Sequence, residues 1–149
     1  MLGTYLLGEL SKSDNNALLI LEDIVSKDEN WRVQEMLAKA FDAYCNAKGY
    51  KDCLEKIKCW IGSENVNIKR AVTEGLRIWT NRDYFKENPK VAIELIASNK
   101  ATDSEYLLKS IGNDLRDIKK KHPQEIENEI SKWDVNDKNI IFILKLINK

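Results

Sequence analysis

The sequence contains few of the residues that interrupt helices. Its 149 residues include only two prolines and six glycines. Proline removes a backbone donor and glycine destabilises a helix interior, so their scarcity leaves room for long helices and few strands. No apolar run approaches the ~18 residues of a membrane span, and no basic region precedes the short apolar run at the N-terminus. We therefore expect a cytoplasmic protein that does not enter the membrane.

Cysteine and histidine are also scarce. The three cysteines form no Cys-x-x-Cys motif, and there is one histidine, His122. This pattern fits neither a disulfide framework nor a zinc site, and it favours reduced thiols in a cytosolic protein. The sequence also lacks a phosphate-binding glycine loop and the motif of a serine or cysteine nucleophile. We expect no metal and no cofactor.

Neither sign of charge is in excess. The chain carries 24 basic and 24 acidic residues, so its overall field does not indicate a nucleic-acid binder. The distribution is less even, because the segment 51–122 holds 15 basic residues and 11 acidic ones. This local positive excess fits either an ordinary solvated surface or a modest binding patch, and the sequence leaves both open.

One apolar pattern occurs three times along the chain, in the stretches 28–41, 65–79 and 102–115. The coinciding apolar positions are Val33, Ile68 and Leu107, then Leu37, Val72 and Ile111, then Phe41, Leu76 and Leu115. The offsets are 35 residues from Val33 to Ile68 and 39 from Ile68 to Leu107. Helical patterns that repeat at such periods are typical of stacked helix pairs of the HEAT or armadillo kind.

The repeats predict an all-α fold, a HEAT-like or armadillo-like helical-repeat superhelix. We expect one domain over 1–149, with repeat helices near 31–48, 66–79 and 105–121. Between them the pattern predicts a helix over 50–61 and a polar connection over 80–88. A strongly apolar helix over 136–147 ends the chain, and it is expected either to cap the stack or to form a dimer contact.

Trp31 and Glu35 are the candidate catalytic residues. They lie four apart at the start of the first repeat helix, so the indole and the carboxylate share a face one turn apart. Such a pair can line a pocket in which a base stacks and a cation is stabilised. The alternative is structural: Trp31 packs between helices and Glu35 is a solvated residue near the helix end.

The basic residues of the central repeats are candidates for binding DNA. Arg70 and Arg77 lie two helical turns apart and can contact successive phosphates, with Lys69 extending the patch. Glu35, Arg70 and Lys109 occupy equivalent positions in the three repeats and would form one row across the stack. That row is either a binding surface or a set of salt bridges between repeats, because acidic residues are interleaved with the basic ones.

Three segments carry a resemblance to a known family. They read ENWRVQEMLAKAFD, VNIKRAVTEGLRIW and SEYLLKSIGNDLRDIKKKHP. Together they resemble the bacterial DNA alkylation repair family of HEAT-like-repeat glycosylases. The third segment is the most distinctive, because family members commonly have a similar glycine, leucine-arginine and lysine-histidine-proline string.

The resemblance implies an activity and a partner. Members hydrolyse the N-glycosidic bond of alkylated purines in duplex DNA, and they need no metal. Trp31 and Glu35 match the cleft aromatic and carboxylate of the family, which stabilise positive charge on the sugar and the base. Asn113 falls where several members have a second cleft tryptophan, and Arg116 belongs to the leucine-arginine string, so both are expected at the DNA. The alternative is a non-catalytic module that binds DNA or a protein partner on its concave face.

Overall fold

The computed structural model describes all 149 residues, which form helices and turns but no strand. The chain is divided into two compact units, Met1–Gly75 and Leu76–Lys149. The prediction that 1–149 makes up one domain stays a prediction. None of the helices has both the length and the apolar character that crossing a membrane requires.

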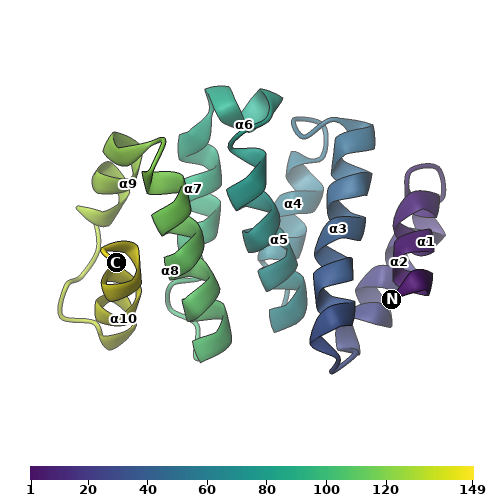
Figure 1. Cartoon of the computed structure of the whole chain (residues 1–149), viewed down its shortest axis with the longest axis horizontal. Helices are drawn as coiled ribbons and strands as arrows, with labels where there is room; N and C mark the ends of the chain where they lie inside the picture. Colours follow the sequence, from purple (N-terminus) through teal and green to yellow (C-terminus); the bar gives the residue numbers. More distant parts are fainter. The chain divides into compact units, whose positions relative to one another are not determined.

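The first unit is built on α3, which spans the predicted range Trp31–Lys48 (Figure 1). Its other elements are α1 (Leu2–Ser11), α2 (Asn15–Asp23), the 3-10 helix η1 (Val25–Lys27), α4 (Leu54–Ile61) and the first part of α5 (Val66–Trp79). The helix α1 packs against α2 and α3. It approaches α3 closely, because a Cβ atom at Gly8 would lie 2.8 Å from Cα of Ala40.

The start of α4 corrects one prediction. The helix begins at Leu54 rather than at residue 50, because 50–53 form a turn after α3. Gly49 ends α3 with a φ of 91°, a backbone conformation that glycine tolerates. The buried Tyr50 side chain then turns back toward α3, where its hydroxyl donates to the Asp42 carboxylate at 2.9 Å. Farther along, Trp60 of α4 stacks on Phe41 with ring centroids 3.9 Å apart.

The second unit contains the last part of α5 and five further helices (Figure 1). They are α6 (Asp83–Glu87), α7 (Pro89–Ala97), α8 (Glu105–Lys119), α9 (Pro123–Ile130) and α10 (Lys138–Ile147). The expected polar connection over 80–88 therefore contains a short helix, α6. Phe85 accounts for it, since this side chain is fully buried and stacks on Trp79 at 5.9 Å between centroids.

The last helix packs within its own unit, as expected of a cap. The apolar face of α10 lies against α8 and buries Ile140, Ile143 and Ile147. The two helices come very close at Gly112, where a Cβ atom would lie 2.7 Å from Cβ of Leu146. Glycine at this position permits the contact, which any larger residue would block.

The predicted repeat positions are buried. Of the coinciding apolar residues, all but the half-buried Val33 are at most 3% exposed. Two of the repeat helices begin at side-chain caps: Asn30 accepts from Arg32 N at the start of α3, and Ser104 accepts from Leu107 N at the start of α8. The inward faces of α3, α5 and α8 are thus those that the sequence predicted, which also defines their outward faces.

Candidate functional site

Trp31 stands at the surface of the first unit. It is the first residue of α3, and 64% of it is exposed. The guanidinium of Arg32 lies 5.2 Å from the centroid of the Trp31 ring. The structural alternative, in which this indole packs between helices, is therefore wrong. An exposed indole offers an apolar face to a ligand.

Glu35 lies one turn farther along α3 and forms an ion pair with Arg70 of α5. Nη2 of Arg70 donates to Oε1 of Glu35 at 2.5 Å. The Arg70 side chain is only 14% exposed, whereas that of Glu35 is 41% exposed. The second carboxylate oxygen, Oε2, accepts no hydrogen bond from the protein. The arrangement is the salt bridge between repeats that the sequence offered as an alternative, and it leaves one oxygen open to solvent.

The start of α5 is anchored so that Arg70 faces Glu35. Oδ1 of Asn65 caps the helix by accepting from Asn67 N at 2.9 Å, and its Nδ2 donates to Oγ of Ser26 at 2.9 Å. Nδ2 of Asn67 donates to the Ser26 carbonyl at 2.8 Å. These bonds tie α5 to η1, in the turn that leads into α3. The sequence by itself does not indicate this set of bonds, because an asparagine before a helix indicates a cap but not its long-range partner.

Lys69 is the predicted DNA-binding residue of the first unit whose side chain has no ion-pair partner. Its side chain is partly exposed and makes no ion pair. The structure thus brings Glu35 and Arg70 together on the first unit, with Trp31 one turn before Glu35 on α3 and Lys69 next to Arg70 in the sequence of α5. It supplies an aromatic face, a carboxylate oxygen and one open cation within consecutive turns of two helices.

In the second unit Arg77 is held by two carboxylates of α8. Its Nε lies 3.2 Å from Oδ1 of Asp114, and its Nη1 lies 3.4 Å from Oδ2 of Asp117. Asp114 is buried and also accepts from the Ser110 hydroxyl at 3.1 Å. The predicted alternative of paired charge therefore describes Arg77 in this structure. A phosphate can bind it only by competing with these carboxylates.

Asp117 is surrounded by cations. The hydrogen bond from Lys120, followed by the charges of Lys120, Arg77 and Arg116, lowers the pKa of its carboxyl below the usual value, although partial burial opposes this shift. The carboxylate therefore stays ionised to a lower pH than an ordinary aspartate does. It links the end of α5 to the last turns of α8.

The remaining predicted DNA-binding residues lie along α8. Lys109 pairs with Glu105 at 2.7 Å, and both side chains are well exposed. Asn113 is half-buried and makes no side-chain hydrogen bond. Arg116 has one long ion pair, 3.9 Å from its Nε to Oδ1 of Asp117. The structure does not bring Lys109 or Asn113 into the Arg77 cluster.

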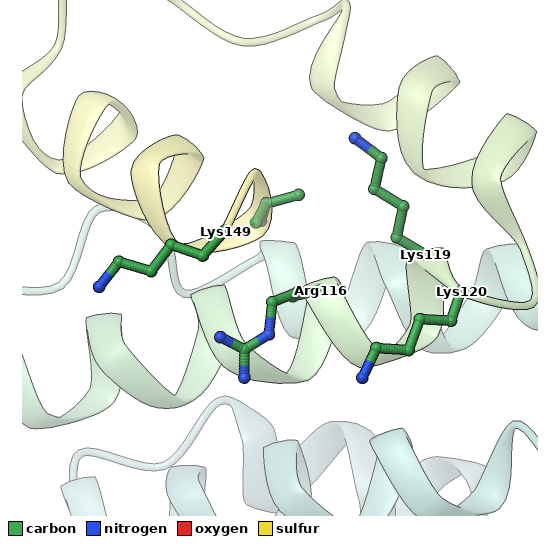
Figure 2. A pocket seen from close by; sticks show the side chains of 5 residues that line it. Arg116, Lys119, Lys120 and Lys149 are labelled. Atoms are coloured by element: carbon green, nitrogen blue, oxygen red, sulfur yellow. The ribbon is translucent and has the colours of Figure 1, made fainter.

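Arg116 also borders a basic cavity that the sequence did not reveal. The cavity has a volume of about 370 Å³ and lies between α8 and α10 (Figure 2). Its lining residues are Arg116, Lys119, Lys120, Ile147 and Lys149. Lys149 is far from the others in sequence, and no local pattern indicates its place beside them.

The comparisons with known proteins agree on one family. The model described as DNA alkylation repair enzyme matches residues 1–145. Two solved structures from Streptococcus mutans are close relatives. One is smu.31 of strain UA159, at 52% identity and a TM-score of 0.92, covering 98% of this chain and 72% of its own. The other is AlkD2, at 53% identity and a TM-score of 0.93, covering 98% and 70%. None of the curated proteins matches significantly.

Proposed function

This chain belongs to the DNA alkylation repair enzyme family and has a HEAT-like helical-repeat fold, and on that premise we propose that it excises alkylated purine bases from duplex DNA. The observation that supports this proposal best is the exposed indole of Trp31 beside a carboxylate with one open oxygen. This pair offers both a surface for a flat ring and a negative charge for a cation.

The excision of an alkylated purine requires those two features. A purine methylated at N3 or N7 carries positive charge, so its glycosidic bond is already weakened. As that bond breaks, the base leaves with the bonding electrons, and the sugar carbon gains positive charge until water adds to it and a proton is released. A carboxylate stabilises this charge by Coulomb attraction, and an indole face attracts a cationic ring.

Arg70 gives the carboxylate a fixed position. Because one oxygen of Glu35 is bound to a largely buried guanidinium, the other oxygen is oriented before any substrate arrives. Such preorganisation reduces the ordering that the reaction itself requires. The same guanidinium also offsets part of the negative charge. We propose that a DNA phosphate draws Arg70 partly away from Glu35 and so strengthens the field of the carboxylate.

The residues proposed to contact DNA fall into two groups, according to whether a carboxylate of the protein already pairs closely with the side chain. Lys69 and Arg116 have donors to spare and can bind phosphates directly. Arg70, Arg77 and Lys109 are paired with carboxylates and would exchange them for phosphates, and Asn113 can hydrogen-bond to a base or sugar. A cytoplasmic location follows from the proposal, since bacterial DNA lies there.

A second function is favoured by one specific observation. Of the five arginines and lysines predicted to contact DNA on α5 and α8, three (Arg70, Arg77 and Lys109) already form short ion pairs with carboxylates, and Glu35 is the partner of Arg70. That pattern suits a non-catalytic module that binds DNA or a protein. Incubation with methylated duplex DNA separates the two functions: release of free 7-methylguanine supports the enzyme, and binding without release supports the module.

A further inference from the structure

The helix α1 of the first unit turns its small residues inward. Its buried residues are Thr4, Gly8 and Ser11. Gly8 lies against Ala40 of α3 so closely that a Cβ atom there would be 2.8 Å from the Cα of Ala40. The Ser11 hydroxyl donates to the Gly8 carbonyl at 2.8 Å, so this buried polar group has its partner. The close packing at Gly8 therefore fixes which side of α1 faces the unit.

The opposite side of α1 is apolar and exposed. Leu2, Tyr5, Leu6 and Leu10 follow one another at steps of three and four residues, so they share one face, which we call the α1 face. Each of them is more than half exposed. An amphipathic helix of a globular protein normally buries its large apolar residues and exposes the small and polar ones. The helix α1 does the reverse, which marks the α1 face as a surface for another molecule.

The surroundings of the α1 face are apolar as well. The helix α2 packs against α1 (Figure 1) and exposes Leu19, Ile20 and Ile24. Of the 13 exposed large apolar side chains of the chain, eight lie within residues 1–24, so they are concentrated rather than scattered. Those of α1 and α2 leave open on the order of several hundred Å², approaching the ~800 Å² that each partner contributes to a specific protein interface.

The charges of this segment argue against DNA or lipid as the occupant. Residues 1–24 include four acidic residues and one basic residue, Lys12. A helix that lies on a membrane carries lysine and arginine on its polar face, and a DNA contact also needs cations. The molecule that covers the α1 face is therefore a protein with an apolar surface of its own.

Glu9 and Lys12 make the α1 face complementary to itself. Glu9 lies one turn after Tyr5 and Leu6, and its carboxylate pairs with Lys12 of the same chain at 2.6 Å. Both side chains are about two-fifths exposed, so a partner can reach them. In a two-fold interface each contact occurs twice, with the roles of the two copies exchanged. One anion and one cation beside an apolar face can thus pair with the cation and the anion of an identical face.

We propose that a second copy of this chain covers the α1 face. In this two-fold dimer the apolar residues of the two α1 helices pack together, and Glu9 of each copy lies near Lys12 of the partner subunit. The dimer does not depend on the proposed excision of bases, because neither Trp31 nor Glu35 belongs to the α1 face. Since the apolar area is at the lower end for a specific interface, we expect a Kd on the order of 1–10 µM.

The first test places a charge in the centre of the α1 face. Leu6→Glu changes a residue that is half exposed in the single copy, so the variant should fold normally. Val135→Glu is the matched control, since Val135 is exposed in the second unit, before α10. Sedimentation velocity between ~0.1 and ~100 µM measures the Kd of each protein, and circular dichroism checks the fold. We expect Leu6→Glu to raise the Kd at least about 30-fold and Val135→Glu to leave it unchanged.

The second test asks whether the partner is an identical face. Glu9→Lys leaves two cations beside the α1 face, and Lys12→Glu leaves two anions, so each variant alone should dimerise about tenfold more weakly at low salt. An equimolar mixture of the two should regain the dimer, because opposite charges then meet across the interface. A role confined to the ion pair within one helix predicts no recovery on mixing.

Three results would overturn the inference. A wild type that stays monomeric up to ~100 µM would leave the α1 face to a different protein. A dimer that Leu6→Glu does not weaken, or that Val135→Glu weakens equally, would have its interface elsewhere. A mixture of Glu9→Lys and Lys12→Glu that dimerises no better than either variant alone would exclude the two-fold pairing.

Discussion

Glu35 and Arg70 join the first and second repeats at equivalent positions, with 2.5 Å between Oε1 and Nη2. A separation of 35 residues in sequence thus becomes a direct contact in space. The pair stabilises the first unit and also positions the carboxylate beside Trp31. Stability and the proposed chemistry therefore depend on the same two side chains, and experiments must separate them.

The first prediction concerns the charge of Glu35. Glu35→Gln keeps the shape of the side chain and removes its charge, so it should slow the release of 7-methylguanine by about 10²–10³-fold, the usual loss for one electrostatic contact in the transition state. Single-turnover release from methylated duplex measures the rate, and anisotropy measures binding alongside. Equal rates in the two proteins would make Glu35 structural.

The second prediction concerns the strength of the Glu35–Arg70 pair. Glu35 is 41% exposed, so solvent screens the interaction and we expect a coupling free energy of about 1 kcal/mol or less. Urea unfolding of Glu35→Ala, Arg70→Ala and the double variant closes the mutant cycle. The well-exposed pair Glu105–Lys109 is the control and should give a smaller coupling, because solvent screens it more strongly. A coupling above ~3 kcal/mol would mean that the pair behaves as a buried one.

The third prediction concerns the core. Leu76 is fully buried, so Leu76→Ala should lower the free energy of unfolding by about 2–5 kcal/mol. Leu10→Ala, at a position that is 55% exposed, is the matched control and should change it by about 0.5 kcal/mol or less. Urea unfolding measures both. A loss below ~1 kcal/mol at Leu76 would contradict its place in the core.

The fourth prediction concerns how the free energy of unfolding depends on pH. Because the folded state lowers the pKa of Asp117, its ionised form stabilises the protein above the unfolded pKa of about 3.9, and this contribution is lost as the pH falls through the lower folded value. Asp117→Asn should therefore reduce the free energy of unfolding at pH 7 more than at pH ~3. Urea unfolding at the two pH values measures the difference. The same loss at both would show that the charge of Asp117 does not contribute.

Local sequence determined the helices and their inward faces. Apolar residues at helical spacing predicted the burial of positions such as Leu37 and Ile111, and Asn30 and Ser104 begin helices as caps. These features depend on residues within a few turns of one another, so a single stretch of chain contains the information.

Tertiary structure decided the features that depend on contacts between separate elements. The turn before α4 depends on the bond from Tyr50 to Asp42, and α6 depends on the burial of Phe85 against Trp79. Charge pattern alone allowed Arg70 either a phosphate or Glu35, and the packing of α5 near α3 selects Glu35. Lys149 joins Arg116 only because α10 packs on α8. A charged side chain is satisfied by whichever opposite charge the fold brings near it, so its partner is a property of the packed molecule.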